Sequence, residues 1–221
     1  MLKEEIAENR DKMKDQSRIK RFKYFWYYHW KPVLLGMIVV CCIISYIRHF
    51  IEDSKEPSIY VAMVNCNIIS NEQTGLLTDY AASRNIDTDL NPTRLDVNLQ
   101  MSENRNDNLD VANSQKLSAF LESGDIDVVL APQWVMESCA DQAYFENIET
   151  ILPDDLYQEF EDRLIYHTYE DDGRVPIAIY VGDIKKVRAL YDEETEPYLA
   201  IGNFSTRQDA AVDFLRYLLE E

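Results

Sequence analysis

The stretch Ile59–Val64, IYVAMV, decides the fold class of this chain. An uninterrupted run of apolar and aromatic residues leaves no polar face, which is typical of a strand buried on both sides in the middle of a sheet. The stretch Ile126–Ala131, IDVVLA, has the same character and ends at Pro132. Strands of this kind need helices on both faces of the sheet, so the two stretches predict an α/β protein.

Helical patterns and a second kind of strand lie between these two runs. We expect the first helix to open on a capping box of Ser70 and Gln73. Leu95–Met101 alternates apolar and polar residues, which indicates a half-exposed edge strand. The polar segment Ser102–Asn113 is expected to be a loop, and Ser114 to begin the second helix.

The second half of the domain continues the alternation of strands and helices. Ile165–Tyr169, Val175–Val181 and Tyr198–Ile201 have strand patterns, and the first two are joined by a turn sequence. A closing helix is expected after a capping box of Ser205 and Gln208. The whole pattern predicts a three-layer α/β fold around a mostly parallel sheet.

A different kind of segment precedes this domain. Val33–Ile47, VLLGMIVVCCIISYI, carries no charge, and Lys31 and Arg48 bracket it. The run covers only about 22 Å as a helix, but flanking lysine and arginine side chains extend its reach toward the headgroups. Tyrosine, tryptophan and phenylalanine residues gather before Pro32, as they do at a membrane interface. We therefore expect residues 32-48 to form a transmembrane helix that contacts the lipid bilayer.

The charge pattern orients this helix. The net charge is -18, yet residues 1–32 hold nine basic and five acidic residues, whereas residues 49–221 hold 12 basic and 35 acidic ones. Basic residues stay on the cytoplasmic side, which predicts a cell-membrane protein with a cytoplasmic N-terminus and an extracytoplasmic C-terminal domain. A cleaved signal peptide is the alternative, but the leader is long and no A-x-A site follows. The expected organisation is a basic tail with an aromatic interface belt over residues 1-31, the transmembrane helix over 32-48, a linker over 49-57 and the α/β domain over 58-221.

The domain offers few signals of catalysis. Its acidity repels phosphates, so we expect no nucleic-acid partner. Asp87-x-Asp89-x-Asn91 imitates the start of a calcium loop, but Pro92 stands in place of the required glycine and Asn98 in place of the bidentate glutamate. Phosphate-binding loops and the common hydrolase and metalloprotease motifs are absent from the sequence. We therefore expect no metal, no cofactor and no enzymatic activity.

Four cysteines divide between the two regions. Cys41 and Cys42 lie in the apolar segment and are interpreted as small apolar fillers. Cys66 and Cys139 lie in the domain expected outside the cell, where a disulfide is chemically permitted. Their separation in sequence leaves the pairing open.

Three stretches carry a resemblance to a known family. They are Leu121–Trp134 (LESGDIDVVLAPQW), Tyr144–Pro153 (YFENIETILP) and Tyr198–Tyr217 (YLAIGNFSTRQDAAVDFLRY). Together they resemble extracellular solute-binding proteins of the type 2 periplasmic-binding fold. The resemblance implies that residues 58-221 correspond to one lobe of such a protein, because the usual two lobes need a longer chain.

The candidate ligand-binding residues follow two of the expected strands. Asn65 and Asn67 come after the first strand, and Gln133 and Trp134 come after Ile126–Ala131. Open α/β sheets bind ligands outside the carboxyl ends of their strands, so these four side chains are expected to border a crevice. Trp134 either stacks on a ligand ring there or packs beneath the following helix.

Two functions are compatible with these features. The first is a membrane-anchored extracytoplasmic binding or protein-interaction module without catalytic activity, whose partner is another membrane protein or a cationic ligand. The alternative is a reduced solute-binding receptor that uses the strand-end crevice. A single lobe leaves much of a small solute in water, which favours the first function.

Overall fold

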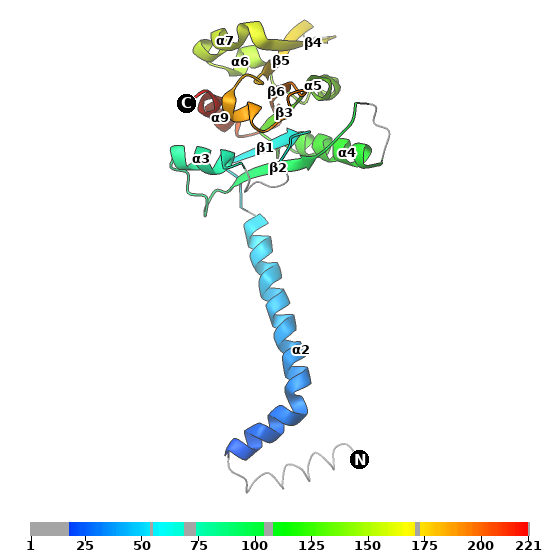
Figure 1. The fold of residues 1–221 in the computed structure, drawn as a ribbon, viewed down its shortest axis with the longest axis vertical. Coiled ribbons are helices and arrows are strands. Elements are labelled where there is room, and N and C mark those ends of the chain that lie inside the picture. Colours follow the sequence, from blue (N-terminus) through cyan, green and yellow to red (C-terminus); the bar gives the residue numbers. More distant parts are fainter. Residues whose placement is uncertain (1–17, 54, 69–73, 104–107, 171–172, 221) are drawn as a thin grey trace. The chain divides into compact units, whose positions relative to one another are not determined.

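A computed structural model describes residues 18–53, 55–68, 74–103, 108–170 and 173–220, and the structural statements below concern these residues. The chain divides into two compact units, Met1–Lys55 and Glu56–Glu221. The first unit contains one long helix and the second contains a sheet with helices on both faces (Figure 1).

The helix of the first unit, α2, spans Arg18–Asp53 and includes Pro32. It is longer than the expected transmembrane segment, since it begins well before residue 32 and continues into the expected linker at residues 49–53. The segment Trp30–Phe50 has a mean hydropathy of 2.1, and its side chains are exposed. By length and composition this helix is able to cross a membrane as a single-pass anchor. A signal sequence satisfies the same criteria, so the orientation of the helix stays a prediction.

The second unit is built on one six-stranded sheet with the order β2-β1-β3-β6-β5-β4. The strands are β1 Ile59–Val64, β2 Thr93–Leu99, β3 Val128–Pro132, β4 Leu164–Tyr169, β5 Gly173–Tyr180 and β6 Pro197–Ile201. β1 pairs in parallel with β2 and β3, whereas the β3–β6, β6–β5 and β5–β4 pairs are antiparallel. The α/β class is confirmed, but the prediction of a mostly parallel sheet is wrong because the sheet is mixed.

The connections account for the parallel pairs and for the β4–β5 hairpin. Parallel neighbours need a crossover of a dozen or more residues, which the helices α3 Leu76–Ser83 and α4 Asn108–Glu122 supply between β1, β2 and β3. Only residues 170–172 separate β4 from β5, and Gly173 at the far side of this turn has a φ of 73°. Such a short connection makes β4 and β5 an antiparallel hairpin.

Helices cover both faces of the sheet and make the three layers that the sequence predicts. The helices are α3 Leu76–Ser83, α4 Asn108–Glu122, α5 Gln133–Ala140, α6 Ile148–Ile151, α7 Asp154–Phe160, α8 Lys185–Arg188 and α9 Gln208–Leu219. The core on one face draws on α3, α6, α7, α8 and α9, and the core on the other draws on α4 and α5. Figure 1 shows α3 and α9 to one side of the sheet and α4 and α5 to the other. Alternate side chains of the strands β1, β3 and β6 pack into the two cores.

Helix starts account for most of the differences from the sequence-based expectation. α4 begins at Asn108, so the later part of the expected loop at 102–113 is helical. Ser70 and Gln73 lie outside the described residues, and α3 begins at Leu76. The capping box expected before α9 does not form. Ser205 Oγ accepts from the Arg207 backbone N–H at 2.9 Å and donates to the Asp127 carboxylate, and Gln208 Nε2 donates to Glu146.

The two domain cysteines do not pair. Cys66 is buried in the core on the α3 side, whereas Cys139 is buried in the core on the α5 side. Neither forms a disulfide, and the sheet lies between the two cores. Burial raises the pKa of the Cys66 thiol above its ordinary value.

Gly124 closes the turn between α4 and β3 with a φ of 74°, and a Cβ there would lie 2.3 Å from the Phe204 carbonyl oxygen. Gly173 has a φ of 73° but open space around it. We expect Gly173→Ala to cost about 1 kcal/mol, because it meets left-handed strain alone. Gly124→Ala meets both the strain and the clash. Its loss of unfolding free energy, measured in urea, should therefore exceed that of Gly173→Ala by at least about 1 kcal/mol. Equal losses of unfolding free energy would mean that Phe204 moves away from the added methyl group at no cost.

Candidate functional site

The expected strand-end crevice exists at the carboxyl ends of β1 and β3. These strands are parallel neighbours, so both end at the same edge of the sheet. α3 and α4 follow β1 and β2 on opposite faces, which places the reversal of strand order at β1. A hollow of about 540 Å³ at this edge is lined by Asn65, Gln133 and Trp134 among others. Three of the four residues proposed from the sequence are thus brought together.

Asn67 does not join them. Its side chain is exposed, and its amide nitrogen Nδ2 donates a hydrogen bond to the Asp192 carboxylate. Its backbone N–H donates to the Leu190 carbonyl at 2.9 Å. These contacts tie the end of β1 to the segment that follows α8, so Asn67 has a structural role beside the crevice.

Asn65 borders the crevice but its amide is already engaged. Its Nδ2 donates to the Met101 carbonyl at 2.8 Å, and its Oδ1 accepts from the Met101 backbone N–H at 2.8 Å. The residue has a φ of 57°, a left-handed conformation that asparagine adopts more readily than most residues. The side chain therefore clamps the chain that leaves β2 and has little capacity left for a ligand.

α5 begins directly after β3 and supplies the central wall of the site. Gln133, Trp134 and Glu137 line the crevice from this helix. The Gln133 amide nitrogen Nε2 donates to Glu137 Oε1 at 2.8 Å, as residues four apart on a helix do. Trp134 is half-buried, so it both packs against the α5 core and presents an edge to the hollow.

Acidic residues that the sequence analysis did not select complete the crevice. β6 runs antiparallel to β3, so Pro132 at the end of β3 pairs with Pro197 at the start of β6. The acidic run that precedes β6 is thereby carried to the carboxyl end of β3. It contributes Glu193, Glu194 and Glu196 to the crevice, and Glu103 joins them from the segment after β2.

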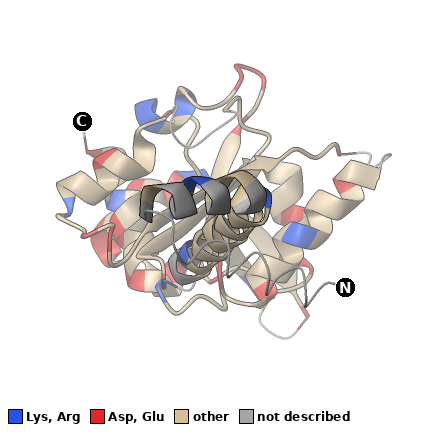
Figure 2. Cartoon of the chain, turned by 90° about the horizontal axis from the view of Figure 1, so that it is seen from below, with Lys and Arg blue, Asp and Glu red and all other residues tan. Residues whose placement is uncertain are grey.

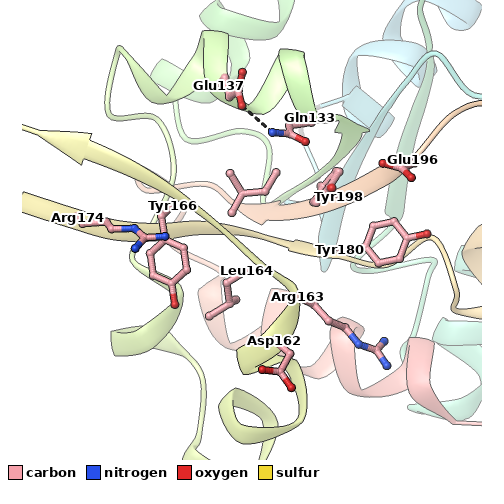
Figure 3. Close-up of a pocket in the computed structure, with 11 residues that line it drawn as sticks. Gln133, Glu137, Asp162, Arg163, Leu164, Tyr166, Arg174, Tyr180, Glu196 and Tyr198 are labelled. Carbon is pink, nitrogen blue, oxygen red and sulfur yellow. Dashed lines mark hydrogen bonds between the residues drawn. The ribbon is translucent and has the colours of Figure 1, made fainter.

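Two further hollows adjoin the crevice, with volumes of about 650 and 590 Å³. All three share Glu137, and we call them together the α5 trough. Figure 3 shows the largest one, with Gln133 and Glu137 on α5 facing Tyr166 and Leu164 of β4. The acidic residues that line the trough are Glu103, Glu137, Asp141, Asp162, Glu193, Glu194 and Glu196. Its aromatic residues are Trp134, Tyr166, Tyr180 and Tyr198.

The two arginines at the trough have their own partners. Arg163 Nη1 lies 2.6 Å from Asp183 Oδ2. The guanidinium of Arg174 lies over the Tyr166 ring, 4.2 Å from its centroid. The imidazole of His167 approaches Asp141, with 3.7 Å between Nε2 and Oδ1. The acidic residues of the trough therefore greatly outnumber its cations, as acidic residues do across the helices and loops of the whole unit (Figure 2).

The negative charges of the trough affect the pKa of the Tyr198 hydroxyl. Burial raises the pKa of the Tyr198 hydroxyl above its ordinary value, and the negative charges of Glu196 and Glu137 add to the increase. Tyr198 packs edge-on against Tyr180, with ring centroids 5.4 Å apart. The phenol stays protonated at neutral pH, so the trough presents carboxylates and neutral aromatic rings.

Carboxylates beside aromatic rings are suited to holding cations. A lysine or arginine side chain gains from charge pairing and from the negative face of a nearby ring, and Arg174 over Tyr166 already shows this contact within the chain. Over the described residues, no group of three or more His, Cys, Asp or Glu side chains is placed to hold a metal ion. The carboxylates and rings of the trough are chemically suited to contact a lysine or arginine side chain.

Comparison of the chain with protein-family models, curated proteins and solved structures gives no match.

Proposed function

We propose that this chain is a membrane-anchored binding module without catalytic activity, and that its α5 trough takes a cationic partner on the extracytoplasmic side. The apolar part of α2 supports the anchor, because its 21 residues Trp30–Phe50 are long enough to span the hydrocarbon core. The basic excess before this segment supports a cytoplasmic N-terminus. The acidic unit Glu56–Glu221 then faces outward.

The composition of the α5 trough carries the proposal. Its acidic residues lie beside half-buried aromatic side chains, and its two arginines are already engaged. A negatively charged cleft attracts cations and speeds their association. The trough is also shallow and open rather than enclosed, which suits a segment of another protein better than a small solute.

A reduced solute receptor is the second candidate. Asn65, Gln133 and Trp134 line one hollow, and the resemblance to type 2 solute-binding proteins supports this reading. Against it, the amide of Asn65 is held by Met101 and the amide of Gln133 by Glu137. A solute that binds the full-length protein at micromolar concentration and loses affinity on Trp134→Ala would favour the receptor.

The cationic partner is tested with decalysine as the probe. Full-length protein in nanodiscs of zwitterionic lipid is titrated with the peptide, and the affinity is measured by calorimetry at two salt concentrations. Three neutralised acids in the trough should weaken binding about tenfold, because each exposed pair contributes roughly 0.2–1 kcal/mol. The trough variant carries Glu193→Gln, Glu194→Gln and Glu196→Gln. Binding of the unchanged protein should also weaken as salt screens the charges.

A matched variant separates the trough from the general charge of the domain. It neutralises three other glutamates, at exposed positions that do not line the trough, so the net charge changes by the same amount. These substitutions are Glu122→Gln, Glu149→Gln and Glu159→Gln. Its affinity should fall by no more than about twofold. Equal losses in the two variants, or no binding of decalysine at all, would overturn the proposed function.

A further inference from the structure

The strand β4 ends the sheet with an edge that carries no charge. In the described part of the chain β4 has a strand neighbour, β5, on one side only. Its sequence, LIYHTY over Leu164–Tyr169, has no acidic or basic residue apart from one histidine, and no proline or glycine. Short segments with high β-propensity and little charge pair readily with another strand when their edge is open.

The opposite edge strand, β2, is protected in the usual way. It carries Arg94 and Asp96 within the strand. Asp96 is buried and forms an ion pair with Lys116 of α4, with 2.5 Å between Oδ2 and Nζ. Charges on an edge strand discourage the approach of a second strand. Charged residues thus protect the β2 edge of the sheet, whereas the β4 edge is able to accept another strand.

The register of the hairpin shows which backbone groups of β4 point outward. Tyr166 pairs with Pro176 of β5, and a proline has no N–H to donate. This pair therefore occupies a non-hydrogen-bonded position of the antiparallel ladder. Hydrogen-bonded and non-hydrogen-bonded pairs alternate, so the pair of Thr168 with Arg174 is also of this kind. The N–H and C=O groups of Tyr166 and Thr168 consequently point away from β5, toward the free edge.

The α5 trough adjoins β4 on the face of the sheet that α5 covers, since Tyr180 of β5 and Tyr198 of β6 also line it. The residues 162–166 line one of its hollows and 166–168 line the next. Side chains of a strand alternate between its faces, so these consecutive lining residues indicate that the hollows reach the free edge of β4. α5 and the residue after it form the facing wall with Gln133, Trp134, Glu137, Ser138 and Asp141. That spacing is one side of a helix.

We propose that an extended, basic segment of a partner protein adds to β4 as a further strand, with its lysine or arginine side chains directed to the acids of the α5 trough. Backbone hydrogen bonds to Tyr166 and Thr168 provide affinity, and Glu137, Asp141 and Glu196 select for positive charge. This inference rests on the proposed function and specifies the form of the cationic partner. A second copy of the chain is the less suitable occupant, because it brings the same acidic surface and like charges repel.

The test distinguishes a strand from a merely cationic ligand. The probe is a decapeptide of alternating lysine and valine, together with two isomers that carry backbone N-methyl groups on all valines or on all lysines. The three peptides have the same charge, but each isomer blocks one edge of the peptide strand. With full-length protein in zwitterionic nanodiscs, one isomer should bind within about twofold of the unmodified peptide and the other at least tenfold more weakly. Equal affinities of the two isomers would overturn strand addition.

Two substitutions at one exposed position of β4 provide the matched pair. Thr168→Pro removes an N–H that points to the free edge without removing a β4–β5 hydrogen bond, and proline keeps the preceding residue extended. Thr168→Val retains the N–H. We expect the proline variant to bind the unmodified peptide at least tenfold more weakly and the valine variant within twofold, with both melting cooperatively. Equal binding by two folded variants contradicts the proposal. If the proline variant fails to fold, the comparison of the methylated isomers decides the question.

The outcomes separate this inference from the function on which it rests. If decalysine binds but the two methylated isomers do not differ, the cationic site stands and strand addition fails. If neither decalysine nor the alternating peptide binds, the proposed function itself fails. Sedimentation of the detergent-solubilised full chain gives a further check. A dimer that Thr168→Pro abolishes would assign the β4 edge to a second copy and overturn the basic partner.

Discussion

Replacing Asp127 by alanine is expected to destabilise the α/β unit by about 3–5 kcal/mol, because the change breaks a buried ion pair and leaves its partners unpaired. Asp127 directly precedes β3 and is 0% exposed. Its carboxylate accepts hydrogen bonds from the Ser205 hydroxyl, from the Tyr60 backbone N–H at 2.7 Å and from Arg207 Nε at 3.0 Å. One side chain thus joins β1, β3 and the entry to α9.

The electrostatics of this carboxylate are a balance of opposed effects. Burial raises the pKa of Asp127 above its ordinary value, whereas the hydrogen bonds from Ser205, Arg207 and the Tyr60 backbone lower it. With the carboxylate removed, Arg207 keeps only its Nη2 hydrogen bond to the Asp125 carbonyl among these contacts, at 2.7 Å. The loss therefore combines a missing acceptor with a partly buried guanidinium that has lost its counter-charge.

Urea unfolding of the full-length protein in detergent measures the effect. Ser205→Ala removes two hydrogen bonds, one to Asp127 and one from the Arg207 backbone N–H, and should cost about 1–2 kcal/mol. Glu122→Ala at an exposed position should change the free energy of unfolding by less than about 0.5 kcal/mol. If Asp127→Ala costs no more than Ser205→Ala, the cluster is not the structural joint that its contacts indicate.

The sequence predicts the central strands well because their apolar runs depend on burial alone. IYVAMV and the VVLA that follows Asp127 leave no polar face, and both form strands that contribute to the cores on the two sides of the sheet. Strand direction is a different matter, since it is set by the connections and not by the strand residues. β6 has the same apolar character as β3 yet runs antiparallel to it, and nothing within Pro197–Ile201 encodes that direction.

The start of α4 was predicted to be a loop because composition alone does not show that its polar residues are buried. The segment Ser102–Asn113 is mostly polar, which favours a loop, yet two polar residues of its helical part, Asp110 and Asn113, lie on the buried side of the helix. Asp110 accepts hydrogen bonds from the backbone N–H and hydroxyl of Ser102, and Asn113 donates to the Gln100 carbonyl at 2.7 Å. These bonds hold the chain that leaves β2 against the helix. Local composition contains no sign of such distant partners.

The place of the candidate site in the sheet could be predicted from the sequence, but its acidic lining could not. Strand ends located Asn65, Gln133 and Trp134 correctly at one edge. Three of the trough's seven acids, Glu193, Glu194 and Glu196, come from the run before β6, which only an antiparallel β6 carries to the end of β3. The sequence does contain a signal, because Asp192–Glu196 is a concentrated acidic run directly before a strand. Recognising it requires the direction of that strand.

Aspartates at Val39 and Val40 together should prevent stable insertion of α2, which is the largest effect expected for any change in this chain. Both residues lie near the middle of Trp30–Phe50, and both side chains are exposed on the helix. Each aspartate at the centre of a span costs roughly 2.5–3.5 kcal/mol on insertion scales, so the pair costs about 5–7 kcal/mol. Val39→Leu with Val40→Leu is the control, since it keeps the segment apolar. The leucine variant should pellet with membranes after a carbonate wash, and the aspartate variant should appear in the soluble fraction or fail to accumulate. Full-length aspartate variant that still resists carbonate would show that α2 is not the anchor.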